Sequence, residues 1–166
     1  MKAELQERVM RFYASEDEIK KDQEAIVRGI FDRHPDFVYL RENAELSDRV
    51  RKECLEGIRD GIARFMKAKG IKDVRDVFER DAFTYFFYDN DKCTALKNRL
   101  TSDPILRSRL YGTEEDSVYE CEHIAEEVAS IYVNEVNRKK LVFSKIILPA
   151  ELDYIDMPEI KGELDN

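Results

Sequence analysis

Apolar residues recur at every third or fourth position along most of the chain, which is the spacing of amphipathic helices. The clearest run predicts a helix over residues 48–69, capped by Ser47 and ended by Gly70. Its apolar face consists of Val50, Cys54, Ile58, Ile62 and Phe65. Gly57 and Gly61 lie at the edge of this face. Because a glycine costs a helix about 1 kcal/mol relative to alanine, we expect a neighbouring helix to pack closely against them.

Two helices are predicted before this one. Residues 3–14 form a short amphipathic segment, and the capping box Ser15–Glu18 opens a second helix. Pro35 lacks an amide hydrogen and biases His34 away from helical geometry, so the second helix should end near His34. Residues 36–46 have a weaker pattern that is compatible with a short helix.

Residues 73–88 would be apolar on nearly every side as a helix. Six aromatic residues fall between Phe78 and Tyr88. A helix without a polar face is a central one, so we predict a core made of helices 48–69, 73–88 and 114–140. Tyr85 and Tyr88 are the aromatic residues expected to reach the surface.

The C-terminal part divides into helices and a tail. A short helix starts at Asp103-Pro104 and ends at Gly112, and Thr113 begins the helix that reaches about Lys140. We therefore predict an all-α fold of six or seven helices, with a bundle domain over residues 1–148 and an acidic tail over residues 149–166. Two interpretations of the tail stay open: a disordered terminus, or a segment that docks on a partner through its apolar side chains. These side chains are Leu152, Tyr154, Ile155, Met157 and Ile160.

The composition of the chain disfavours several classes of protein. The chain has 166 residues, 39% of them charged, and a net charge of −8, which disfavours a nucleic-acid partner. No apolar run approaches the length of a membrane span, and the N-terminus lacks the apolar core of a signal peptide. Three cysteines without a paired motif argue against a disulfide framework, so we expect a cytoplasmic protein.

Two clusters of the sequence partly resemble metal sites. The triplet Asp89-Asn90-Asp91 begins like a calcium loop, but the following positions lack the required oxygen ligand, glycine and glutamate. Glu120 and His123 have the spacing of half a di-iron site, but no second copy exists and the only other histidine, His34, lies beside a proline. Cys121 points to the apolar stripe of its helix and His123 to the charged face, so these two residues should not share a zinc ion.

Catalytic patterns are equally sparse. Two histidines offer little for nucleophilic catalysis, and no glycine-rich phosphate loop is present. Acid pairs such as Glu126-Glu127 are typical of solvated helix faces. One enzymatic alternative stays open, an all-α metal-dependent hydrolase in which Glu16 and Glu53 line one cleft.

Three segments resemble RGS domains, the regulators of G-protein signalling. The segment VRDVFERDAFTYFF (residues 74–87) is similar to the penultimate helices of that family. The pattern Leu46-Ser47-x-x-Val50-Arg51-x-x-Cys54 and the stretch ELQERVMRFY (residues 4–13) resemble two further family motifs, in family order. The resemblance covers about residues 4–98 and implies a helical bundle.

The residues by which that family contacts its G protein are mostly replaced. The Glu-Asn pair of the family is Arg8-Val9 here, the small residue after the aspartate is Ala82, and an arginine is replaced by Tyr85. Only Asp81 matches among these contacts. The resemblance therefore implies the fold without the GTPase-activating function.

These observations favour a non-enzymatic protein-binding module, an adaptor or regulator, with no catalytic residue, metal or cofactor. We expect its partner to be another protein, with no nucleic acid and no membrane, and homo-oligomers are possible. A subunit of a viral or bacterial assembly is a further alternative. The candidate partner-binding residues are Asp81, Tyr85, Tyr88, Tyr154, Ile155, Met157 and Ile160.

Overall fold

The structure is a computed structural model that describes residues 11–80, 83 and 93–155, with side chains up to Ile146. Every regular element in this described part is helical, which confirms the predicted all-α class. The elements are α2 (Glu16–Arg33), η1 (Pro35–Glu42), α3 (Ala44–Lys69), η2 (Val74–Glu79), α5 (Thr94–Ser102), α6 (Pro104–Arg109) and α7 (Glu114–Ile155). The two η elements are 3₁₀ helices.

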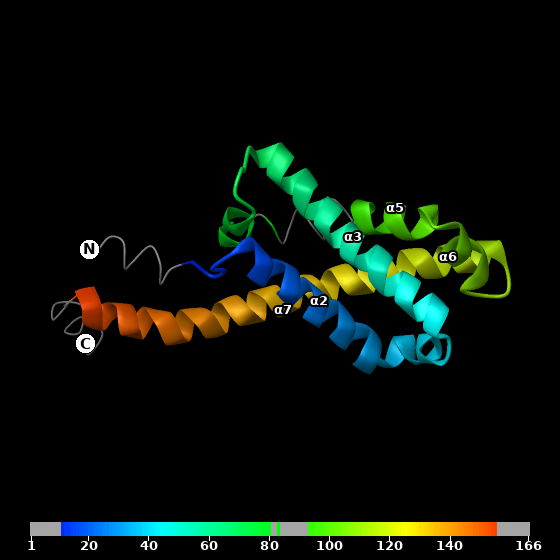
Figure 1. The fold of residues 1–166 in the computed structure, drawn as a ribbon, viewed down its shortest axis with the longest axis horizontal. Coiled ribbons are helices and arrows are strands. Elements are labelled where there is room, and N and C mark those ends of the chain that lie inside the picture. Colours follow the sequence, from blue (N-terminus) through cyan, green and yellow to red (C-terminus); the bar gives the residue numbers. More distant parts are fainter. Residues whose placement is uncertain (1–10, 81–82, 84–92, 156–166) are drawn as a thin grey trace.

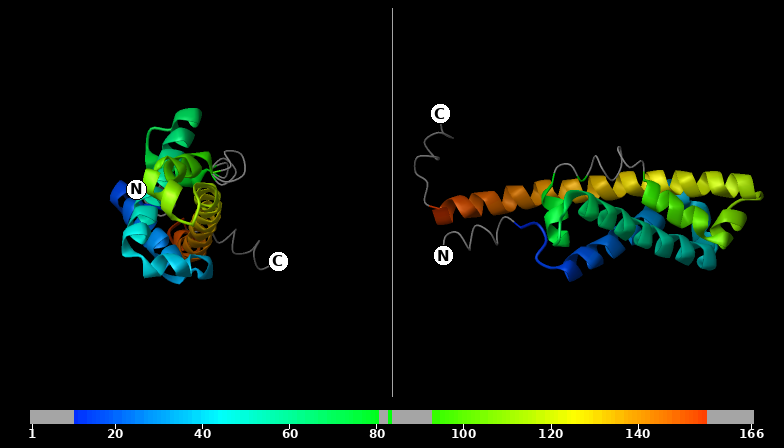
Figure 2. Two further views of the ribbon diagram at one scale, coloured as in Figure 1. Left: turned by 90° about the vertical axis from the view of Figure 1, so that its right-hand side faces the viewer. Right: turned by 90° about the horizontal axis from the view of Figure 1, so that it is seen from above.

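The long helix α7 organises the molecule. Helices α2 and α3 run in opposite directions, joined by η1, and α7 lies across them (Figure 1). Helix α5 packs between α3 and α7, and α6 packs against the first turns of α7 (Figures 1 and 2). The apolar faces of these helices form one continuous core.

The boundaries of α2 agree with the predicted signals. Ser15 Oγ accepts a hydrogen bond from the Glu18 amide at 3.2 Å, and Glu18 Oε2 accepts one from the Ala14 amide at 3.1 Å. The helix ends at His34, whose backbone is extended at φ −71° and ψ 129°. Before α2, residues 11–14 are not helical, so the helix predicted over residues 3–14 does not include them. Residues 3–10 lie outside the described residues.

Helix α3 starts one turn earlier than predicted. Asn43, not Ser47, is the N-cap, because its Oδ1 accepts a hydrogen bond from the Leu46 amide at 3.2 Å. Ser47 is buried inside the first turn. The predicted end at Gly70 is confirmed, since this residue adopts the left-handed conformation at φ 66°.

The predicted close approach at Gly57 is confirmed. A Cβ atom placed on Gly57 would lie 2.9 Å from the Cα of Leu96 in α5. Glycine lets the two backbones approach to this distance, and that approach compensates for its low helix propensity.

The predicted helix over residues 73–88 is wrong for residues 73–80, while Phe83 is helical and residues 81–82 and 84–88 lie outside the described residues. Residues Val74–Glu79 form a 3₁₀ helix, and Arg80 is extended at φ −99° and ψ 124°. Asp73 caps η2, and Phe78 and Phe83 are buried with their ring centroids 5.3 Å apart. The two described aromatic residues of this segment are therefore core residues, while its backbone starts as a 3₁₀ helix and not as an α-helix.

Helix α7 is longer than predicted. It begins after Thr113, whose Oγ1 accepts a hydrogen bond from the Asp116 amide at 3.1 Å, and it continues past Lys140 and through Pro149 to Ile155. A proline removes one helical donor, and here it does not end the helix. The predicted tail boundary at 148/149 therefore lies within helical backbone.

Candidate functional site

The predicted partner-binding residues fall mostly outside the described part of the chain. Asp81, Tyr85, Tyr88, Met157 and Ile160 are not among the described residues. Tyr154 and Ile155 lie in the last turn of α7, where the backbone alone is described. All seven assignments stay predictions.

The described surface nevertheless has a concentrated apolar feature on the same helix. Beyond Lys140, α7 projects past the other helices of the bundle (Figures 1 and 2). Three large aliphatic side chains within six residues are exposed there, Leu141 at 64%, Val142 at 45% and Ile146 at 64%. We call these three residues the α7 apolar patch. The sequence predicted a helix that reaches about Lys140, so it did not indicate this patch.

The base of this projecting segment is fixed to the bundle. Asp22 of α2 accepts a hydrogen bond from the Tyr13 hydroxyl and forms an ion pair with Lys139 of α7. Burial, together with the bond to Asp22, raises the pKa of Tyr13, so its hydroxyl remains a donor. The ring of Phe143 meets that of Phe12, with centroids 5.8 Å apart. The α7 apolar patch therefore starts from an anchored point.

Charge is distributed unevenly along the end of α7. Residues 136–150 contain four basic residues and no acidic one. These are Arg138, Lys139, Lys140 and Lys145. The following residues 151–165 contain six acidic residues and one lysine. The α7 apolar patch thus lies in a basic segment that is followed directly by an acidic one.

The glutamates of the hydrolase alternative do not converge. Glu16 lines a groove of about 810 Å³ between α2, α3 and η2, together with Lys20, Arg59 and Asp73. Glu53 does not line this groove. It lies near Asp103 and Arg99, and partial burial raises its pKa. The described residues therefore do not assemble the proposed carboxylate cleft.

Glu120 and His123 also diverge. Glu120 is buried beside the hydroxyl groups of Tyr39 and Tyr111. Burial and the nearby Glu120 carboxylate raise the pKa of both tyrosines. Cys121 is fully buried and its pKa rises to about 12 through desolvation, as expected for a core thiol.

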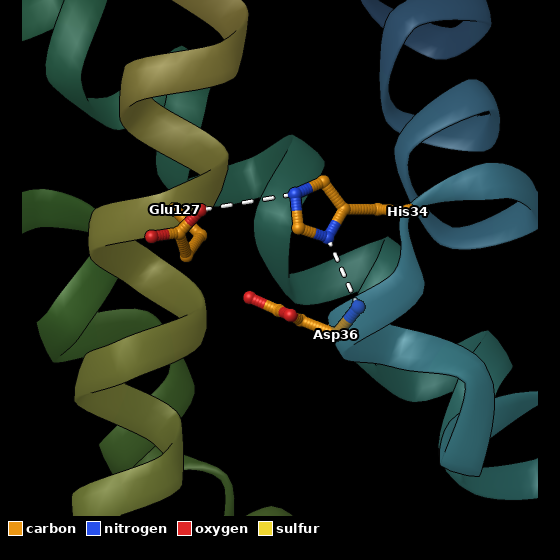
Figure 3. A group of neighbouring side chains, drawn as sticks. All are labelled: His34, Asp36 and Glu127. Carbon is orange, nitrogen blue, oxygen red and sulfur yellow. Dashed lines mark hydrogen bonds and ion pairs between the residues drawn. The ribbon is translucent and has the colours of Figure 1, made fainter.

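Both histidines of the chain, however, lie at the same joint of the fold. His34 Nε2 is 3.9 Å from Glu127 Oε2 of α7, and His123 Nε2 of α7 is 3.9 Å from Asp36 Oδ2 of η1 (Figure 3 draws His34, Asp36 and Glu127). We call these four residues the histidine–carboxylate cluster. Sequence reasoning missed it because its members come from segments about ninety residues apart, and the only local signal was the i, i+4 spacing of His123 and Glu127.

No protein-family model, curated protein or solved structure matches this chain. Among the described residues, no helix has both the length and the apolar content to cross a bilayer.

Proposed function

We propose that this chain is a protein-binding module that pairs with a second copy of itself through the end of α7. The observation that carries this proposal is the exposure of Leu141, Val142 and Ile146 on a helix segment that projects from the bundle. Clustered exposed aliphatic side chains are typical of protein interfaces.

The energetics favour a partner for this segment. Burying one large aliphatic side chain contributes about 1.5–3 kcal/mol. The burial of three such side chains would therefore contribute more free energy than the side-chain pairs within an isolated helix, which contribute about 0.2–0.5 kcal/mol each. A helix packed against the α7 apolar patch would supply this burial.

Charge complementarity favours a second copy as that helix. In an antiparallel pair, the basic segment 138–145 of one α7 would run beside the backbone of residues 151–155 of the other, whose sequence contains Glu151 and Asp153 and no basic residue. The same match occurs twice in a two-fold symmetric pair, because such an interface uses one surface on both copies. A parallel pair would place like charges side by side, which is unfavourable.

Analytical ultracentrifugation of the full chain across a range of concentrations tests the proposal. We expect a monomer–dimer equilibrium that the double variant Leu141→Glu/Ile146→Glu weakens at least about tenfold, since each lost apolar contact is worth 1.4 kcal/mol or more. The matched control is Tyr119→Glu, because Tyr119 is 76% exposed on the opposite end of the same helix. Circular dichroism checks that each variant keeps its helical content.

Other outcomes would replace the self-pairing proposal. A chain that stays monomeric at all concentrations contradicts it. A monomer that binds anionic lipid vesicles through the same leucine and isoleucine would assign the basic apolar segment to a membrane surface instead. Deletion of residues 150–166 should also abolish pairing, because it removes the acidic half of the interface. A dimer of unchanged affinity after this deletion would show that the tail is not part of the interface.

The adaptor or regulator role and the RGS resemblance are separate predictions. Their direct test is an affinity capture with intact and tail-less protein that includes a nucleotide-loaded G protein. Capture of the chain by the G protein would support the resemblance. If the G protein does not capture the chain and the chain forms a dimer, self-assembly is the supported role.

A further inference from the structure

The histidine–carboxylate cluster depends on the break between α2 and η1. Pro35 ends α2 and holds His34 in extended geometry, so the His34 ring leaves the axis of α2 and faces α7. His123 and Glu127 lie one turn apart on α7 and face back toward η1. Each histidine therefore faces a carboxylate that belongs to the other element.

The donor atoms of the cluster lie near one another, at a spacing wider than that around a bound metal ion. One donor atom from each of His34, Asp36 and Glu127 lies within 4.8 Å of the other two. Donors around a four-coordinate zinc ion are about 3.4 Å apart, given bonds of about 2.0–2.1 Å. All three side chains are partly exposed (27%, 51% and 37%), which leaves them room to rotate toward that spacing.

We propose that His34 Nε2 and the carboxylates of Asp36 and Glu127 bind a divalent transition-metal ion, of which Zn²⁺ is the representative. An imidazole nitrogen combined with carboxylate oxygens selects first-row transition metals over Mg²⁺ and Ca²⁺, which prefer oxygen ligands alone. The ion would neutralise two carboxylates that face each other across the joint. It would also crosslink α7 to the α2–η1 turn.

His123 is a positioning residue in this proposal. Its Nε2 lies 3.9 Å from Asp36 Oδ2, on the α7 side of that carboxylate. A histidine that orients a ligating carboxylate typically changes metal affinity by about 10- to 100-fold when it is removed. Removal of His34, a direct ligand, should lower metal affinity by a larger factor.

Binding has one structural cost. His34 Nδ1 accepts a hydrogen bond from the Asp36 amide at 3.2 Å and so caps η1. A neutral imidazole that coordinates metal through Nε2 carries its proton on Nδ1, so this bond must open. The loss of one cap weakens binding by about fivefold, which is small beside the effect of a metal ligand.

The joint is accessible to an ion. His34 also lines a cavity of about 450 Å³, with Arg33, Glu135 and Arg138 among the other lining residues. Water from this cavity can supply the remaining coordination positions. The site is on a different part of α7 from the α7 apolar patch, so it is independent of the proposed self-pairing.

Titration of the untagged full chain with Co²⁺ and Zn²⁺ tests the site. We expect one ion per chain, a Co²⁺ ligand-field absorption spectrum typical of nitrogen and oxygen ligands, and a higher melting temperature with Zn²⁺. His34→Gln should weaken Zn²⁺ affinity by more than about 100-fold, and His123→Gln by about 10- to 100-fold. Mg²⁺ at the same concentrations should give neither a heat nor a thermal shift.

The matched control is Glu126→Gln, because Glu126 is the neighbour of Glu127 but pairs with Lys97 at 2.9 Å on another face. It should bind Zn²⁺ as the unchanged chain does. The proposal is wrong if the unchanged chain does not bind, if His34→Gln binds equally well, or if a sulfur-to-cobalt charge-transfer band shows that cysteines hold the ion. Circular dichroism confirms that the variants are folded, so weak binding is not mistaken for unfolding.

Discussion

Asp103 Oδ2 lies 3.0 Å from Nη1 of Arg49, which joins the start of α6 to α3. The same aspartate caps α6, since its Oδ1 accepts hydrogen bonds from the amides of Ile105 at 2.9 Å and Leu106 at 3.3 Å. Asp103 is 7% exposed, whereas Arg49 keeps 40% of its side chain in solvent. One buried carboxylate therefore combines a helix cap with a contact between helices distant in sequence.

Replacement of this carboxylate should separate its two roles. We expect Asp103→Ala to lower the free energy of unfolding by about 2 kcal/mol, because it removes the cap and the charge-assisted bond to Arg49. Asp103→Asn retains a capping oxygen and should cost about half as much. Urea denaturation measures both free energies of unfolding. An Asp103→Ala variant with the same free energy of unfolding as the unchanged chain would contradict the two roles assigned to Asp103.

The close approach of α3 and α5 gives a second prediction. Gly57→Ala would place a methyl group 2.9 Å from Leu96 Cα, a backbone atom that cannot rotate away. We expect net destabilisation of about 1–2 kcal/mol, since overpacking outweighs the gain in helix propensity. Gly112→Ala is the control, because no heavy atom lies within 4 Å of its added Cβ. Thermal and urea unfolding of both variants should show a loss only for Gly57→Ala.

A third prediction concerns acid stability at the start of η2. The Arg75 guanidinium and amide donate hydrogen bonds to the Asp73 carboxylate, at 2.7 Å from Nη2 and 3.0 Å from the amide, and these bonds hold the pKa of Asp73 well below its usual range. A lowered carboxyl pKa stabilises the fold above the unfolded value of about 3.9 and loses that effect as pH falls toward the folded value. The melting temperature of the unchanged chain should therefore exceed that of Asp73→Asn at pH 5 to 7.

This difference in melting temperature should close as the pH is lowered from 4 to 2. Asp76→Asn serves as the control, since it removes the same charge three residues later without removing the bonds between Asp73 and Arg75. A gap between the unchanged chain and Asp73→Asn that is constant with pH would show that the carboxylate charge does not contribute.

Local signals in the sequence were sufficient for several elements. Ser15 and Gly70 mark helix ends by satisfying backbone groups within one turn, and the capping contacts of α2 and α3 confirm these ends. Signals of this kind depend on residues that are neighbours in the chain, so they can be read without coordinates. The spacing of Gly57 likewise predicted a close helix neighbour but not that this neighbour is α5.

The break at Arg80 and the continuation of α7 past Lys140 were not predicted. Periodicity describes which residues are apolar, and Phe78 and Phe83 are indeed buried, but it does not determine whether residues 74–80 form an α-helix or a 3₁₀ helix followed by an extended residue. Residues of η2 pack against α3, a contact between distant segments that local periodicity does not include.

The sequence by itself determined the all-α class, the capped ends of α2 and the burial of Phe78 and Phe83, because these follow from short-range geometry and apolar content. Only the tertiary structure placed His34 and Asp36 beside His123 and Glu127, and only it left Leu141 and Ile146 uncovered on a projecting helix. Both features depend on where α7 crosses the other helices. That crossing results from many simultaneous side-chain contacts between residues far apart in the chain, which no local pattern specifies.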